Sequence, residues 1–300
     1  MINLPAQLTE DVLVQGLRHS DSWLAALLNQ SPCEVSFDQL QWVEPGGITP
    51  LASISANHSW EISKPKDKVY TYLQRMRFTQ IFGLDDSFHF LEHDPTGRFI
   101  SAIWIQKQEH IELVIREIKM ILSQSQLEPG VQWAVAWSLN EFLGNVLIHS
   151  CAEIGGLVFA QVFPSRNIVQ IAVCDPGIGI TGSIRQWNPQ WQGTDEMALK
   201  LALQQGWSSK KGSDGKGNGL YLVKQIIEHN GSINRLVLIS GMAIAVVSEN
   251  GTVYESTAVD WPGTSLSCTF DLSRRVDMEK ILGHTDDLDD DEVWEVNEWL

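Results

Sequence analysis

Three polar side chains recur every four residues in an otherwise apolar segment. They are Glu141, Asn145 and His149, in the stretch NEFLGNVLIHS at residues 140–150. Residues four apart on an α-helix lie one above the other, so the three side chains form one stripe. A carboxylate, an amide and an imidazole aimed in one direction could bind a ligand. Polar residues with satisfied hydrogen bonds in a core give the same pattern, so the rest of the chain has to decide.

A carboxylate followed by two glycines stands at the end of an apolar strand, where Asp175, Gly177 and Gly179 lie in VCDPGIGI. Glycines let the backbone approach a ligand closely, and the carboxylate could accept a hydrogen bond, so a nucleotide base and its phosphates would fit here. The pattern alone is equally typical of an ordinary turn.

A second glycine set, GSDGKGNGLYLVK at residues 212–224, runs directly into an expected helix. The free N–H groups at a helix start favour an anion, and Lys210, Lys211 and Lys216 add positive charge. The alternative is a solvated loop. A third short segment places Gly263 and Thr264 at the entry to a late strand, where the hydroxyl could hydrogen-bond a ligand or a bound water.

The elements that must position these residues follow from periodicity and from Gly and Pro. We expect a small α/β domain at residues 1–105, with one strand at 33–43, a short helix at 45–54, a helix at 67–83 and a strand at 99–106. The remaining expected helices are 109–126, 131–150, 195–206 and 220–231, and the remaining strands are 156–164, 167–175, 236–247, 251–259 and 264–272. This order predicts an α+β sandwich over residues 106–275, with helices on one face of a mixed, largely antiparallel sheet.

Composition limits the function. The 300 residues are 43% hydrophobic and carry a net charge of −16, which argues against direct binding to nucleic acid or to an anionic membrane surface. The four cysteines are far apart and favour reduced thiols over disulfides or a zinc site. The longest apolar run, residues 236–247, is too short for a membrane span, and we expect a cytoplasmic protein.

The order and spacing of the four segments resemble the ATP-binding boxes of the GHKL superfamily, which includes gyrase, histidine kinases and MutL-type ATPases. The resemblance covers roughly residues 107–272 and implies the Bergerat fold, which is a helix-on-sheet sandwich, with ATP and Mg²⁺ as ligands. It implies that Asn145 binds the Mg²⁺ ion, that Glu141 is the general base and that Asp175 accepts from the adenine amino group. The remaining residues that it implies at the nucleotide are Gly177, Gly179, Gly215, Lys216, Gly217, Gly219, Leu220 and Thr264. His149 either touches the nucleotide or packs.

Within the superfamily, the two helices before the first box look similar to the anti-sigma-factor serine kinases. This implies a kinase that transfers the γ-phosphate of ATP to a Ser or Thr of a STAS-type or sigma-factor-like partner protein. The alternative is a nucleotide-gated binding switch with slow hydrolysis or none. A homodimer is a reasonable expectation from the same resemblance.

The segment at residues 33–54 resembles part of a STAS domain. At the place of the acceptor hydroxyl it has Glu44-Pro45-Gly46-Gly47, which indicates a docking or dimerising unit rather than a substrate; an unrelated α/β unit is the alternative. The segment 276–300 is an acidic tail, with eight acids among residues 286–300. Its aromatics could anchor on a partner, it could cover the lysine-bearing glycine loop, or it could be solvated.

Overall fold

The computed structural model describes residues 1–84, 98–125, 127–207, 218–277 and 281. One five-stranded sheet organises the described chain, in the order β6-β7-β8-β10-β9, and every neighbouring pair is antiparallel. Its strands are β6 (Phe99–Ile105), β7 (Gly156–Phe163), β8 (Ile168–Asp175), β9 (Arg235–Ser248) and β10 (Gly251–Asp271). The mixed α+β architecture with an antiparallel sheet agrees with the fold expected from the sequence.

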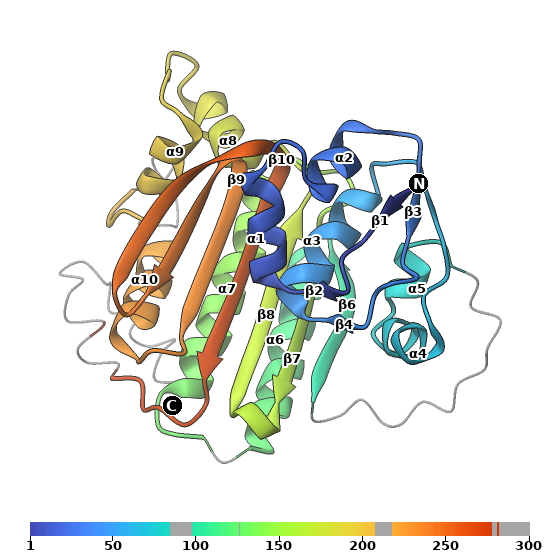
Figure 1. The fold of residues 1–300 in the computed structure, drawn as a ribbon. Coiled ribbons are helices and arrows are strands. Elements are labelled where there is room, and N and C mark those ends of the chain that lie inside the picture. The colour runs from blue at the N-terminus through green and yellow to red at the C-terminus, as the bar shows by residue number, and fades with distance from the viewer. Residues whose placement is uncertain (85–97, 126, 208–217, 278–280, 282–300) are drawn as a thin grey trace.

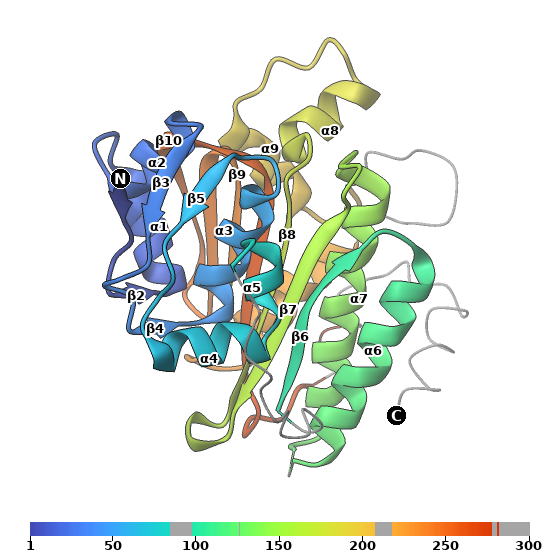
Figure 2. The same cartoon turned by 90° about the vertical axis from the view of Figure 1, so that its right-hand side faces the viewer.

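Helices cover one face of this sheet (Figures 1 and 2). They are α6 (Gln108–Ser123), α7 (Val131–His149), α9 (Asp195–Ala202) and α10 (Gly219–His229), and the short α8 (Gly179–Trp187) follows directly after β8. Their buried aliphatic side chains share one core with alternate residues of the strands, such as Val158, Ala160, Ile171 and Val173. This layer holds α7 and the start of α10 beside the end of β8.

The N-terminal residues form a third layer on the opposite face of the sheet (Figure 2). Their elements are β1 (Ile2–Asn3), β2 (Gln7–Leu8), α1 (Glu10–Arg18), α2 (Trp23–Asn29), β3 (Cys33–Ser36), β4 (Trp42–Val43), α3 (Pro45–Ser55), β5 (Trp60–Ile62), α4 (Asp67–Arg75) and α5 (Phe78–Ile81). Their short strands pair in parallel, as β1-β3-β5 and β2-β4. We call residues 1–84 the N-terminal unit.

The second core joins the N-terminal unit to the sheet. Leu157 and Phe159 of β7 and Val237 and Ile239 of β9 pack there with the buried leucines of the N-terminal unit. Because side chains alternate between the faces of a strand, β7, β8 and β9 are apolar on both sides, which explains their nearly continuous hydrophobic sequences. We expected helices on one face of the sheet only. The structure adds a layer on the other face.

Several expected elements differ from the structure. The strand expected at 33–43 is two strands in two sheets, and the helix expected at 67–83 breaks at Arg77, whose φ is 64°. The two last expected strands are one element, β10, with shifts of register between Ser256 and Thr264. Phe99–Ile105, which the expected boundary at 105 placed with the N-terminal domain, pairs with β7 at the edge of the large sheet.

Candidate functional site

Asp175 is the last residue of β8, and its carboxylate is buried there. Its Oδ1 accepts a hydrogen bond from the Gly177 N–H at 2.9 Å, and Thr264 of β10 lies opposite in the register and also donates to it. Burial raises the pKa of Asp175 to about 6, although the hydrogen bonds from Gly177 and Thr264 act in the opposite direction. A desolvated carboxylate of this kind is suited to accept a hydrogen bond from a bound base.

Glycine is required around this carboxylate because other backbone segments lie against it. A Cβ on Gly177 would overlap the Ser150 carbonyl oxygen, and a Cβ on Gly263 would overlap the carbonyl oxygen of Asp175. Gly263 also has a φ of 76°, which L side chains rarely adopt. The end of α7 is joined to the same turn, since the Ile178 N–H donates to the Ser150 carbonyl at 2.9 Å. The sequence motifs at 145–150, 175–179 and 263–264 therefore meet.

The polar stripe of α7 runs along the helix toward this turn. Asn145 is half-buried, and its side chain makes no hydrogen bond or ion pair within the part of the chain that the structure describes. An amide oxygen of this kind fits a Mg²⁺ ion that keeps several waters and takes its remaining ligands from phosphates. His149 lies next to α8, where its Nδ1 is 3.3 Å from the Ser183 hydroxyl oxygen, so this side chain contacts the protein.

The start of α10 meets the first residue of the stripe. A Cβ on Gly219 would overlap the Glu141 carboxylate, which places this acid against the first turn of α10. The Asn218 side chain, at the N-cap of α10, does not cap this helix, and its amide oxygen accepts from the Gly206 N–H at 2.9 Å instead. N–H groups at a helix start attract anions. The Leu220 side chain packs against the helix-side core.

Three residues expected at the site, Gly215, Lys216 and Gly217, lie outside the described residues. The sequence reasoning missed α8 and its contacts. Thr181 donates to Asp195 Oδ1 at 2.5 Å, and Asp195 Oδ2 accepts from the Met242 N–H at 2.8 Å. Asp195 therefore ties α8, α9 and β9 together beside the turn that follows β8. The apolar residues Ile180 and Ile184, four apart after Gly179, were the signal for this helix.

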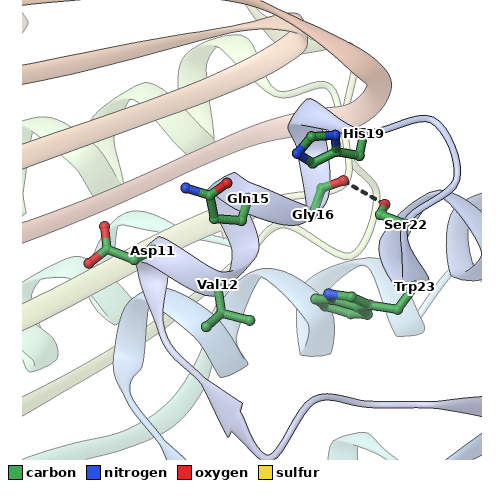
Figure 3. A pocket seen from close by; sticks show the side chains of 7 residues that line it. All are labelled: Asp11, Val12, Gln15, Gly16, His19, Ser22 and Trp23. Carbon is green, nitrogen blue, oxygen red and sulfur yellow. Dashed lines mark hydrogen bonds between the residues drawn. The ribbon is translucent and has the colours of Figure 1, made fainter.

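A separate hollow lies between α1 and α2, with a volume of about 380 Å³ (Figure 3). It shares no residue with the α7, β8 and α10 site. The Asp11 carboxylate pairs with Arg235 at 2.8 Å, and the Ser22 hydroxyl donates to the Gly16 carbonyl at 2.6 Å. Two polar side chains of this hollow are therefore already bound within the protein.

None of the helices in the described part of the chain is long and apolar enough to cross a membrane. Within the same residues, no cluster of three or more His, Cys, Asp or Glu side chains is placed to hold a metal ion.

Residues 134–274 match the family described as histidine kinase-, DNA gyrase B- and HSP90-like ATPases. The match begins within α7, ends just after β10 and includes every element of the α7, β8 and α10 site. No curated protein matches the chain.

Proposed function

We propose that this chain, whose residues 134–274 form a GHKL-type ATPase domain, binds ATP with Mg²⁺ and transfers the γ-phosphate to a Ser or Thr of a partner protein. The family implies ATP binding, and the kinase activity of the anti-sigma-factor type is our inference. The observation that carries it is the meeting of α7 with α10, since Glu141 lies against the first turn of α10 and a helix start suits phosphate.

In this proposal each group has the role that the family resemblance implies. Asp175 accepts from the adenine amino group, and Thr264 beside it hydrogen-bonds the base or a bound water. Gly177 and Gly179 let the backbone come close to the base. The first N–H groups of α10 bind phosphate oxygens, assisted by the glycines and Lys216 of residues 215–217. Asn145 is the protein ligand of the Mg²⁺ ion, which, when bound, neutralises charge on the phosphates.

Glu141 performs the proton step. As a carboxylate against the phosphate-binding helix start, it accepts the proton of the attacking hydroxyl while that oxygen forms its bond to the γ-phosphorus. The bond to the ADP leaving group breaks, and the displaced ADP keeps the electron pair. Without an acceptor hydroxyl, water takes the same place and the reaction is hydrolysis.

The test separates a role of Glu141 in turnover from a role in ATP binding. Glu141→Gln should abolish transfer from γ-labelled ATP to a STAS-type partner and leave the ATP dissociation constant nearly unchanged. Glu153→Gln is the matched control, because Glu153 is an exposed acid just after α7. Full turnover in Glu141→Gln would refute the role of Glu141. The second function, a nucleotide-gated switch, is favoured if the wild-type protein binds ATP without turnover.

The N-terminal unit acts in this proposal as a docking unit with a degenerate STAS-like fold. Pro45, Gly46 and Gly47 are buried at the start of α3, and the Glu44 carboxylate pairs with Arg166 at 3.0 Å. Thr49, the nearest hydroxyl, is fully buried. A kinase could not reach a phosphate acceptor in this position. In this proposal the partner is a separate STAS-type or sigma-factor-like protein, and the chain forms a homodimer, which sedimentation would measure.

A further inference from the structure

The end of α3 lies behind the turn that carries Asp175. The buried Ser53 hydroxyl donates to the Cys174 carbonyl at 3.1 Å, and the Asn57 side chain, just after α3, donates to the Pro176 carbonyl at 3.5 Å. These are the two carbonyl groups on either side of Asp175. The N-terminal unit thus hydrogen-bonds the backbone of both residues that flank Asp175, whose carboxylate is proposed to recognise adenine.

Near Asp175, one side of β8 faces the helical layer and the other side faces the N-terminal unit. Val173 packs in the helix-side core, and Leu157, opposite Cys174 in the register, packs in the core of the N-terminal unit. Because side chains alternate along a strand, Asp175 points to the same side as Val173, and α3 supports the strand from the other side. A single strand separates the proposed nucleotide from α3.

The N-terminal unit is fixed to the sheet by charge as well as by its core. Arg235 lies 2.8 Å from Asp11, and Arg18 lies 2.8 Å from Glu255. Residues Pro45 to Ile54 of α3 are all buried. A helix held this firmly can transmit its position to β8, because packed interiors resist deformation.

We propose that the N-terminal unit completes the nucleotide site from behind, with Ser53 and Asn57 as positioning residues that set the direction of the Asp175 carboxylate and hence the preference for adenine. This inference rests on the proposed function. It predicts reciprocal coupling: ATP binding stabilises the contact between α3 and β8, and loss of that contact weakens ATP binding. Guanine offers a carbonyl oxygen where adenine has its amino group, so GTP gains nothing from a well-placed Asp175.

The experiment compares ATP and GTP affinities by calorimetry in the full-length protein. In Ser53→Ala/Asn57→Ala we expect ATP to bind about fivefold more weakly, the effect of about one hydrogen bond, while GTP affinity stays the same. Ser55→Ala is the matched control on the same helix, because the Ser55 hydroxyl donates to the Ala52 carbonyl and not to the sheet. It should leave both affinities unchanged.

Three outcomes decide the matter. Equal weakening of ATP and GTP, or no change in either, would overturn the positioning role, because a purely structural defect does not act through the base. If Ser53→Ala fails to fold, Asn57→Ala alone must still lower the preference for ATP, since Asn57 is exposed and its loss leaves the core intact. A wild-type protein that binds no ATP would instead refute the proposed function itself.

Discussion

Replacing Asp175 with Asn should change stability and ligand binding in opposite directions. The side chain keeps its size and an oxygen that can accept from the Gly177 N–H, but it is never charged. In the protein without ligand, the buried charge is a cost. In the complex proposed here, the same charge is an acceptor for the adenine amino group. Asp175→Asn should therefore stabilise the ligand-free protein and weaken the binding of ATP.

The magnitudes follow from the pKa of Asp175, which burial raises from 3.8 to about 6. A carboxyl group with a raised pKa in the folded state contributes stability below pH 3.8 and loses it as the pH rises through 6. At about 1.4 kcal/mol per pH unit, the loss is about 3 kcal/mol, so Asp175→Asn should stabilise the ligand-free protein at pH 7 by up to that amount. ATP affinity should fall about tenfold or more, because a hydrogen bond to a charged group is lost.

The wild-type protein should show the same carboxylate as a pH dependence of binding. With a pKa of about 6, Asp175 is about nine-tenths ionised at pH 7 and about one-tenth at pH 5, so ATP affinity should fall about tenfold between them. Calorimetry and urea unfolding at both pH values measure the two effects. Asp175→Asn is the control, because it keeps every other source of pH dependence in the protein and the ligand. A variant that loses both stability and affinity, or a wild-type affinity independent of pH, would refute this reasoning.

Three further predictions concern other parts of the molecule. Asn145→Ala should lower ATP affinity about tenfold with Mg²⁺ and leave it unchanged with EDTA, and calorimetry showing equal loss in both would contradict a metal ligand. Gly263 has a φ of 76°, and a Cβ there would overlap the Asp175 carbonyl oxygen, so Gly263→Ala should lower the unfolding free energy by about 1–3 kcal/mol and abolish ATP binding. Gly251→Ala is the control, because it has similar backbone strain but open space around the new Cβ, and this variant should still bind ATP. Burial raises the pKa of Glu10 to about 7 despite nearby Arg235, so Glu10 should lower wild-type stability between pH 4.5 and 7 by at most about 3 kcal/mol beyond the fall due to Asp175. Urea unfolding of Glu10→Gln should keep only the Asp175 part of this pH dependence.

The sequence predicted the helix side of the fold well and the N-terminal side poorly. Long periodic segments such as α6 and α7, and apolar runs such as β7 and β8, carry their structure in local patterns. The N-terminal strands have two to four residues each, too few for any period, and the helix at 67–83 breaks at Arg77 without a Gly or Pro to announce it. The short strands and the helix break depend on tertiary contacts, which the local sequence does not reveal.

The same difference holds for the site. Asp175 and its glycines were visible because their types and spacing follow directly from close backbone approach. The roles of Ser53 and Asn57 could not be predicted, since their partners are carbonyl groups about 120 residues away, as the separations of 121 and 119 show. A serine inside a helix and an asparagine after it have ordinary local explanations. Contacts with backbone carbonyls leave no pattern in the residues that accept them.

Because both faces of the large sheet are covered, truncation of the chain has a predictable consequence. A fragment cut at residue 106 would lose its edge strand β6 and expose Leu157, Phe159, Val237 and Ile239 to water, although all four are buried in the intact chain. Bare apolar faces and open strand edges promote aggregation. The rest of the chain is therefore not a transferable module, and deletion of residues 1–105 would test solubility before it tested regulation.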